Sequence, residues 1–373
     1  MTETTGGLGS EAHELHPGRL GLVQIHPASA SAPPRVFALA GSAVAGRSHR
    51  LELQLDDARV SRRHASLEPA AGGVRVRDLG SRHGTFVSAK RVPAEGMLAP
   101  LGSVLRVGDS LLLVVKDVES FRSRPRRTDG SQLGLTETMV AGPELAAVWD
   151  EAARVASLPE PVLIVGETGS GKECVARMIH AARPEPGPFV GINVAAVPDS
   201  LAEAELFGYE RGAFTGATVG RPGAFRCAEG GVLFLDEIGE LPPALQPKLL
   251  RALDRGEVRP LGGHNEVRVS ARIVSATSRS LANEQGDAGL RPDLYYRLAG
   301  VIIRVPPLRE RPADALWLAL ELLSTWSPAT RLSADAAERL VLSPWKGNAR
   351  ELRHRLTQAL VRAGSTGVLR VEH

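Results

Sequence analysis

A glycine-rich octapeptide, GETGSGKE at positions 166–173, constrains this chain of 373 residues more than any other stretch. It directly follows VLIV, an apolar run of strand length, and directly precedes a helical pattern. Glycines in that setting let backbone N–H groups turn toward phosphates, and the helix N-terminus adds its dipole. A chance glycine-rich turn would rarely combine strand, loop, lysine and helix. The sequence therefore predicts a nucleotide-binding loop made of Gly166, Glu167, Thr168, Gly169, Ser170, Gly171, Lys172 and Glu173.

The last two residues of this loop define what it is expected to bind. In such loops the lysine, here Lys172, reaches the β- and γ-phosphates of a nucleotide such as ATP. The next position usually carries a serine or threonine whose hydroxyl binds Mg²⁺, whereas this chain has Glu173. The hydroxyl ligand is therefore missing from its usual place.

A pair of carboxylates, Asp236 and Glu237, ends a second apolar run, GGVLFLDE. A buried strand that delivers two carboxylates to its C-terminal end suits Mg²⁺ binding, directly or through water, at Asp236. The other carboxylate can then polarise the attacking water. Taken alone, the pair could mark a strand entering solvent. Together with the phosphate loop, it favours nucleotide hydrolysis over nucleotide binding alone.

Changes of composition along the chain predict a multidomain fold. Residues 1–18 are polar and are expected to be a disordered leader. Short alternating or apolar runs over 19–116, separated by Gly, Pro, Asp and Ser, predict an all-β sandwich. Residues 117–136 are rich in charge, Ser, Pro and Gly and predict a linker. Uninterrupted apolar runs over 137–306 predict an α/β core with a parallel sheet, and residues 307–373 are expected to be helical.

Two helix ends can be recognised in the C-terminal part. Ser333 is a plausible N-cap before ADAAERLVL, and Gly364 stands where a C-cap glycine would end the helix NARELRHRLTQALVRA. Both positions support the helical interpretation of this part.

Composition and charge limit the remaining possibilities. A formal charge of +3 with a pI near 9.1 is weak evidence for nucleic-acid binding. Cys174 and Cys227 are too few for a disulfide framework, and no Cys/His spacing resembles a metal site, so we expect a reducing, intracellular setting. The first residues lack the features of a secretory signal, and no apolar run approaches the ~18 residues of a membrane span. We therefore expect a cytoplasmic protein without a membrane partner.

Six motifs occur together between residues 137 and 370: GETGSGKE, ELFGYERGAFTGA, GGVLFLDEIGEL, LRPDLYYRL, VPPLRERPAD and WKGNARELRH. Their order and spacing resemble the AAA+ ATPase domain of sigma-54-dependent transcriptional activators, the bacterial enhancer-binding proteins. This resemblance implies an α/β P-loop ATPase core with a helical lid over 307–373, ATP and Mg²⁺ as ligands, and action on the sigma-54 RNA polymerase holoenzyme. This family carries glutamate where the present chain has Glu173.

The resemblance also assigns roles to three further residues. Asn193, in GINVAAV, is similar to the residue that switches Glu237 between resting and active orientations. Arg291 and Arg297, in RPDLYYR, are similar to arginine fingers offered to the nucleotide of a neighbouring subunit, where cationic forks stabilise the transition state. Without the resemblance they would be interpreted as surface arginines on a helix. Fingers acting between subunits imply a ring, in this family usually a hexamer.

Two nucleotide sensors are implied in the same way. Arg350, in NAREL, matches the sensor on the lid, and Thr277 with Ser278 matches the sensor in the core. Asn is common in the family at the second of these core positions, where serine can still donate a hydrogen bond.

The hexapeptide GAFTGA, Gly212 to Ala217, is nearly diagnostic of the family and implies a contact with sigma-54. Glycines at both ends are expected to act as hinges that let the nucleotide state raise or fold the tip. The contact surface would comprise Gly212, Ala213, Phe214, Thr215, Gly216 and Ala217.

Within the β-rich part, GRS (46–48), SRRHA (61–65) and DLGSRHGTFV (78–87) resemble the forkhead-associated (FHA) domain, a β-sandwich that binds phosphothreonine peptides. Arg47 would provide a charged fork for the phosphate, Ser61 an additional donor and Arg62 a second cation. His83 stands where the family usually has an asparagine that grips the peptide backbone, so selectivity can differ. The competing interpretation is a degenerate sandwich used only for packing.

Activators of this family usually end in a helix-turn-helix domain. The residues after Arg350 are expected to finish the lid instead, so direct DNA binding is not predicted, unless the sequence is truncated. Two other functions remain open from the sequence. One is a non-enzymatic phosphopeptide-binding adaptor with a nucleotide-locked scaffold, and the other is a ring ATPase that remodels a different target.

Overall fold

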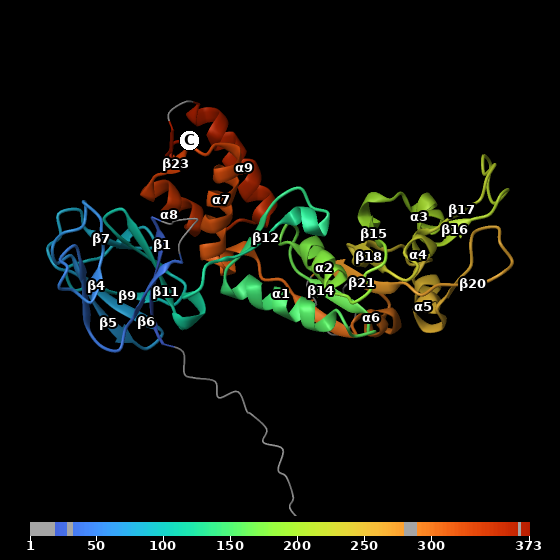
Figure 1. Cartoon of the computed structure of the whole chain (residues 1–373), viewed down its shortest axis with the longest axis horizontal. Helices are drawn as coiled ribbons and strands as arrows, with labels where there is room; N and C mark the ends of the chain where they lie inside the picture. Colours follow the sequence, from blue (N-terminus) through green and yellow to red (C-terminus); the bar gives the residue numbers. More distant parts are fainter. Residues whose placement is uncertain (1–18, 28–32, 280–288, 365–366) are drawn as a thin grey trace, which may run out of the picture. The chain divides into compact units, whose positions relative to one another are not determined.

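The computed structural model describes residues 19–27, 33–279, 289–364 and 367–373. The chain divides into two compact units, Met1–Arg124 and Pro125–His373 (Figure 1). Each unit has its own buried core, so each is described by itself.

The first unit consists of two β-sheets that share one core. The larger sheet has the order β2 (Arg35–Ala38), β1 (Gly21–His26), β11 (Ser110–Val115), β10 (Val104–Val107), β7 (Thr85–Val87) and β8 (Lys90–Arg91). The smaller sheet has the order β4 (Leu53–Gln54), β3 (Ala43–Gly46), β5 (Ala65–Ala70), β6 (Gly73–Asp78) and β9 (Met97–Pro100).

Alternation of apolar and charged residues explains how these sheets pack. In β6, Val74 and Val76 are fully buried while Arg75 and Arg77 are exposed, as expected for a strand with one face on a core. Residues from both sheets meet in a single cluster that includes Leu67 and Leu112. The predicted β-sandwich is therefore confirmed.

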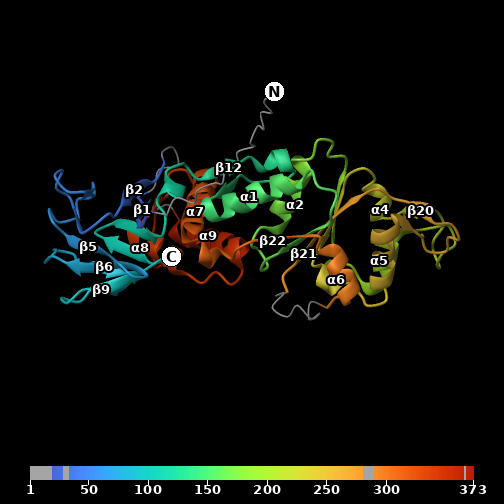
Figure 2. The ribbon, with the colours of Figure 1, turned by 90° about the horizontal axis from the view of Figure 1, so that it is seen from below.

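The core of the second unit is a five-stranded parallel sheet. Its order is β15 (Phe189–Asn193), β18 (Val232–Asp236), β21 (Arg272–Thr277), β14 (Val162–Val165) and β22 (Val301–Arg304). The helices around it are α1 (Pro143–Val155), α2 (Lys172–Ala181), α3 (Asp199–Phe207), α4 (Ala224–Cys227), α5 (Gln246–Arg255) and α6 (Pro292–Leu298) (Figures 1 and 2).

Strand β14 shows why its sequence is apolar throughout. Val162 and Ile164 pack in a cluster with α1 and α2, while Leu163 and Val165 pack in a second cluster with α3 to α6. Both faces of the sheet are thus covered, which requires an uninterrupted apolar strand. Because parallel strands end at the same edge, the residues that follow them gather there.

A helical lid forms the C-terminal part of the second unit. It contains α7 (Pro312–Trp326), α8 (Ala334–Leu342) and α9 (Asn348–Ala363), and a short parallel pair, β23 (Arg331–Leu332) and β24 (Val368–Leu369). Ser333 caps α8 by accepting a hydrogen bond from the N–H of Ala336, and Gly364 follows α9 with φ +55°. Both predicted helix ends are confirmed.

The segment expected to be a linker, 117–136, is more ordered than its composition suggested. Val118 and Phe121 are buried in the first unit, which continues through the short helix η1 (Glu119–Phe121). From Pro125 the chain belongs to the second unit, where β12 (Arg126–Thr128) pairs with β13 (Met139–Ala141) around η2 (Gly130–Leu133). We call residues 126–141 the strap. The observed boundary therefore lies within the expected linker.

Two connections extend from the sheet of the second unit. The first follows α3 and is closed at its base by β16 (Gly208–Tyr209) and β17 (Arg221–Pro222). The second is the hairpin of β19 (Glu257–Val258) and β20 (Val267–Arg268), which lies beside the first (Figure 1). A bridge between Tyr209 and Leu261 joins them. Within the described residues, no helix is both long enough and apolar enough to cross a membrane.

Candidate nucleotide site

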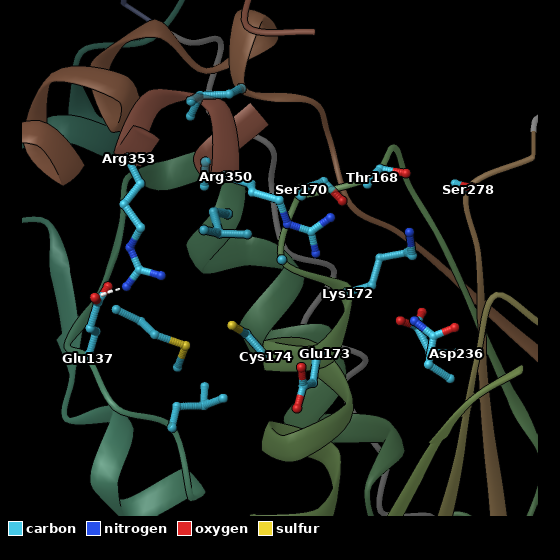
Figure 3. A pocket seen from close by; sticks show the side chains of 18 of the residues that line it. Glu137, Thr168, Ser170, Lys172, Glu173, Cys174, Asp236, Ser278, Arg350 and Arg353 are labelled. Atoms are coloured by element: carbon cyan, nitrogen blue, oxygen red, sulfur yellow. Dashed lines mark ion pairs between the residues drawn. The ribbon is translucent and has the colours of Figure 1, made fainter. Parts of the chain in front are cut away.

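A cavity of about 790 Å³ lies in the second unit at the edge where the parallel strands end. Its walls come from the nucleotide-binding loop, the carboxylates after β18, the strap and the lid. Figure 3 shows Lys172 and Asp236 facing the same space, with Arg350 above them on the lid. The predicted residues that line it are Thr168, Gly169, Ser170, Gly171, Lys172, Glu173, Asn193, Asp236, Glu237, Ser278 and Arg350.

The loop starts at the end of β14 and leads directly into α2. The N–H of Gly166 donates to the carbonyl of Thr277 (3.2 Å), which fixes the start of the loop against β21. Gly169 and Gly171 have φ of +75° and +109°, a backbone region that disfavours other residues. A Cβ on Gly169 would lie 2.4 Å from the carbonyl oxygen of Gly347 on the lid. The glycine spacing therefore serves both the turn and its contact with the lid.

Lys172 lies inside the cavity rather than in solvent. Its side chain is buried, and its ammonium group donates to the carbonyl of Gly166 (3.0 Å) and to Oε1 of Glu237 (3.1 Å). A buried cation at the N-terminus of a helix, beside a glycine loop, is suited to bind a polyphosphate.

Glu237 is held on both carboxylate oxygens. Its Oε2 accepts hydrogen bonds from the N–H (3.0 Å) and the hydroxyl (2.7 Å) of Ser278, while Oε1 faces Lys172. Burial acts to raise its pKa, but the bonds from Ser278 and the charge of Lys172 hold the pKa of Glu237 below its ordinary value. Glu237 is therefore kept ionised, as a residue that polarises water must be.

Asp236 has the opposite environment. Burial raises its pKa, the charge of Lys172 opposes this rise, and the neighbouring Glu237 adds to it. The two carboxylates thus differ electrostatically although they are adjacent in the chain.

The remaining predicted residues are placed as follows. Asn193 lies opposite Asp236 in the β15–β18 pair and lines the cavity, but among the described residues the Glu237 carboxylate is bonded to Lys172 and Ser278, not to Asn193. Thr277 is buried and does not line the cavity; its hydroxyl accepts from the N–H of Arg279.

Arg291 and Arg297 lie at the start and within α6, away from the cavity of their own chain. Arg291 pairs with Asp293 (2.8 Å) and Arg297 with Asp254 (3.0 Å), and both arginines are about half exposed. Their guanidinium groups are therefore accessible from outside the chain.

The cavity is also lined by strap and lid residues that the motifs did not indicate. The lining includes six apolar side chains of a kind suited to contact a nucleobase: Met139, Val140, Leu145, Trp149, Leu318 and Leu322. Glu137 on the strap pairs with Arg353 on α9, which joins strap and lid at the cavity (Figure 3). Arg353 follows Arg350 by one helical turn, and that spacing was a signal for a second lid residue facing the site.

Both cysteines are free. Cys174 lines the cavity, and burial raises the pKa of its thiol to about 11. It therefore stays protonated at neutral pH.

The chemistry of the donor set fits a nucleotide with its cation. Ser170 Oγ is buried and has no hydrogen-bond partner among the described residues, so the loop contains a polar atom that a bound group would satisfy. Asp236 lines the cavity and offers hard carboxylate oxygens, the ligands that Mg²⁺ prefers. Position 173 offers a carboxylate in place of the usual hydroxyl.

The GAFTGA hexapeptide lies in the connection between β16 and β17. Gly212 and Gly216 both have positive φ, +84° and +98°, and the N–H of Gly212 donates to the carbonyl of Ala217 (2.8 Å). Phe214 is 44% exposed and its ring centroid lies 5.0 Å from that of Tyr209. The glycines thus occur where the chain must turn, with an aromatic side chain left accessible between them.

The predicted phosphopeptide residues of the first unit lie on neighbouring loops. The N–H of Arg47 donates to the carbonyl of Ser61 (3.0 Å), and the hydroxyl of Ser61 accepts from the N–H of Arg82 (3.2 Å). The side chains of Arg47, Arg62 and His83 are exposed. Three loops thus present two cations and an imidazole around Ser61.

Buried His64 and partly buried Asp78 hold these loops in shape. His64 is fully buried; its Nδ1 accepts from the N–H of Ser61 (3.1 Å), and its Nε2 lies 3.1 Å from the carbonyl oxygen of Gly84. Asp78 accepts from both hydroxyls of Ser81 and Thr85 (2.6 Å each). Partial burial acts to raise the pKa of Asp78. The hydrogen bonds from Ser81 and Thr85 outweigh that effect, so the pKa of Asp78 lies below its ordinary value.

Comparison with known families agrees with this geometry. Residues 139–304 match the model of the sigma-54 interaction domain, and residues 43–108 match that of the FHA domain. The chain carries a sigma-54 interaction domain of the AAA+ class and an FHA domain. The recognition made from the motifs, and the fold class that it implied, are confirmed.

Curated relatives of this sigma-54 interaction domain are transcription regulators. The chain is 47% identical to the Nif-specific regulatory protein of Azotobacter vinelandii over 255 residues, which cover 66% of this chain and 48% of that protein. It is 41% identical to the nitric oxide reductase transcription regulator NorR2 of Cupriavidus necator over 293 residues, 76% of this chain and 56% of the relative. The chain thus spans about half the length of the curated relatives it matches.

Solved structures also resemble the second unit. NtrX from Brucella abortus superposes with a TM-score of 0.57 at 31% identity, covering 61% of this chain and 54% of NtrX. NtrX in complex with ATP gives a TM-score of 0.53 at 32% identity, over 59% of this chain and 51% of NtrX.

Proposed function

We propose that this protein hydrolyses ATP and uses the energy to remodel the sigma-54 RNA polymerase holoenzyme through its GAFTGA loop. The observation that supports this most directly is that Lys172, Asp236 and Glu237 share one cavity, in the same unit as a loop with an exposed Phe214. NtrX, a structural neighbour, has been solved with ATP, and the curated relatives are transcription regulators.

The chemistry follows from the positions of these side chains. Lys172 and the N–H groups of the loop bind the β- and γ-phosphates. Asp236 would hold Mg²⁺, which would neutralise phosphate charge when bound. Glu237, kept ionised by Ser278 and Lys172, orients and polarises the attacking water. Asn193 ends the adjacent strand, opposite Asp236. We propose that it becomes a partner of Glu237 when that carboxylate changes orientation.

Completion of the site requires a second copy of the chain. Arg291 and Arg297 lie outside the cavity of their own chain and are half exposed, as groups that act on a neighbouring subunit must be. We propose a ring, a hexamer, in which these arginines stabilise the charge developing on the transferred phosphoryl group. Arg350 would report the nucleotide state to the lid.

The FHA unit is proposed to bind a phosphothreonine peptide and so to regulate the ATPase. Arg47 and Arg62 supply exposed cations, and the loop of Ser61 is held by buried His64. Charge-assisted bonds to phosphate are the strongest contacts that this arrangement can make.

A promoter-melting assay with sigma-54 holoenzyme and ATP tests the proposal. Wild-type protein is expected to open the promoter, whereas Thr215→Ala is expected to hydrolyse ATP without opening it. If wild type hydrolyses ATP but never opens a sigma-54 promoter, the activator function is wrong and the ATPase function survives. If wild type shows no turnover with Mg-ATP at ring-forming concentration, the protein is instead a binding adaptor.

A further inference from the structure

The lid donates hydrogen bonds to backbone carbonyl groups of the nucleotide-binding loop. Three consecutive carbonyl groups of the loop, at residues 168–170, each accept a hydrogen bond from a lid residue. The donors are the Asn348 side-chain amide to Thr168 (3.0 Å), the Ala349 N–H to Gly169 (3.1 Å) and the Arg311 guanidinium to Ser170 (2.8 Å). We call these three contacts the lid clamp.

Both polar atoms of the Asn348 side chain make hydrogen bonds, one of them in this clamp. It is fully buried with φ +52°, a region that asparagine tolerates better than other residues with side chains. Its Oδ1 accepts from the N–H of Leu308 (2.7 Å), and its Nδ2 also reaches the Glu167 carboxylate (3.2 Å). The side chain therefore ties the start of α9, the turn before α7 and the loop into one network.

Arg311 is likewise held by several hydrogen bonds. It is buried, and besides Ser170 it donates to the carbonyl of Pro306 (3.1 Å) and to Asp314 Oδ2 (3.2 Å). The other oxygen of Asp314 accepts from the N–H of Gly142 at the N-terminus of α1 (2.6 Å). A buried arginine with these partners has no freedom to leave the loop without breaking an ion pair.

Carbonyl direction determines where the loop can donate. In a planar trans peptide, C=O and the following N–H point in opposite directions. A Thr168 carbonyl held by the lid therefore turns the N–H of Gly169 the other way, and a Ser170 carbonyl so held does the same for Gly171. Neither of these N–H groups has a backbone partner among the described residues, whereas that of Ser170 closes a turn with Glu167. Gly169 and Gly171 both line the cavity, so their N–H groups are available to a phosphate bound there.

We propose that Arg311 and Asn348 are positioning residues for phosphate binding, which hold the loop with its N–H groups turned toward the polyphosphate. This proposal rests on the proposed nucleotide function of the cavity. It adds a physical reason for the orientation of the loop N–H groups. The VPPLRERPAD and WKGNARE motifs then affect phosphate binding indirectly, because they hold the loop that binds the phosphates.

The test compares ligands with and without phosphates. Affinity of the full chain for a fluorescent ADP analogue is measured by titration, and adenosine is measured by competition. Arg311→Lys and Asn348→Asp are expected to weaken ADP binding at least tenfold and to change adenosine binding less than twofold. Arg355→Lys is the matched control, because Arg355 lies on α9 and faces Glu351 (3.8 Å) rather than the loop.

Asn348→Asp keeps the size and the Oδ1 acceptor but loses both donated bonds. It also adds a negative charge, so Glu167→Gln is introduced beside it to restore the charge of the network. The loss of ADP affinity is expected to persist in the double variant, because no donor then replaces Nδ2 at Thr168. Recovery to wild-type affinity would show that charge alone was responsible and would overturn the clamp.

Other results have distinct meanings. If the variants lose equal affinity for ADP and for adenosine, Arg311 and Asn348 stabilise the pocket as a whole. That result would overturn the proposal. Unchanged ADP binding in both folded variants, with folding judged by their thermal transitions, would do the same. If wild type itself binds adenosine but not ADP, the proposed function fails first.

Discussion

The ammonium group of Lys172 lies 3.1 Å from Oε1 of Glu237, and both side chains are largely buried. The lysine expected to bind phosphate and the carboxylate expected to polarise water are thus direct partners in this structure. A polyphosphate that competes for Lys172 would release one oxygen of Glu237, while Ser278 keeps the other. One ion pair would therefore link phosphate binding to the activation of the proposed base.

Glu237→Gln is expected to retain nucleotide binding and to lose turnover. An amide still accepts from Ser278 but cannot polarise water as a carboxylate does, so kcat should fall about 10²- to 10⁴-fold. Phosphate release and titration with a fluorescent nucleotide measure the two effects separately. Ser278→Ala, which keeps the backbone N–H, should cost only about tenfold. Wild-type turnover in the glutamine variant would rule out Glu237 as the base.

Arg297→Ala and Glu237→Gln should complement each other if the fingers act between subunits. Each variant alone is expected to be inactive. In a mixed ring, some interfaces combine an intact finger with an intact base, so ATPase activity should recover to a fraction of the wild-type rate. Size-exclusion chromatography with light scattering checks that rings form. A mixture as inactive as its components would contradict action between subunits.

The Glu137–Arg353 pair should stabilise the lid over the cavity only modestly. Both side chains are about 40% exposed, and ion pairs of this kind contribute about 0–1 kcal/mol. Glu137→Ala should therefore raise the KM for ATP no more than about fivefold. Exchange of the two charges, Glu137→Arg with Arg353→Glu, should restore much of the loss. An exchange variant worse than either single variant would show that the pair has another role.

Asp314 should make the second unit less stable as pH rises from about 4 to 6. Burial raises its pKa from 3.8 to about 6, although the charge of Arg311 opposes the rise, and Glu144 adds to it. In that window the folded state holds a proton that the unfolded state has released, so stability falls with pH and stays lower above pH 6. Each pKa unit is worth about 1.4 kcal/mol, so the effect amounts to about 3 kcal/mol.

Asp314→Asn isolates this contribution. The difference in unfolding free energy, wild type minus variant, should decrease across the window, and a constant difference would contradict the assignment. Tryptophan fluorescence reports the second unit, because Trp149, Trp317, Trp326 and Trp345 all lie there. Asp335→Asn, at an exposed aspartate of α8, is the matched control.

Arg47→Ala should weaken binding of a phosphothreonine peptide about 10- to 100-fold, because a hydrogen bond to a charged group contributes about 1.5–3 kcal/mol. Fluorescence anisotropy with phosphorylated and unphosphorylated peptides measures this. Arg75→Ala, an exposed arginine of β6, serves as control. His83→Asn should strengthen peptide binding. Equal binding of both peptides by wild type would favour a sandwich used only for packing.

Motifs made the loop, the carboxylates and both domains predictable, because each depends on local sequence. The apolar pattern of a strand shows where that strand ends. Gly169, Lys172 and Asp236 lie at or shortly after such strand ends. The pairing of Glu137 with Arg353 could not be predicted, because it joins segments that meet only after the lid folds. The polar composition of strap residues 126–136 predicts a linker. These residues nevertheless contain β12, which pairs with β13 through backbone hydrogen bonds that do not depend on apolar side chains.

The strap has a practical consequence for dissecting the protein. The region that matches the sigma-54 interaction domain begins at residue 139, yet Leu135, Thr136, Glu137 and Thr138 line the cavity. Arg126 and Arg127, further upstream, pair with Asp150 on α1 and Glu321 on α7 (2.5 Å each). A fragment cut at the family boundary would lose one wall of its nucleotide site and two of its anchors. An isolated ATPase fragment should begin at Pro125.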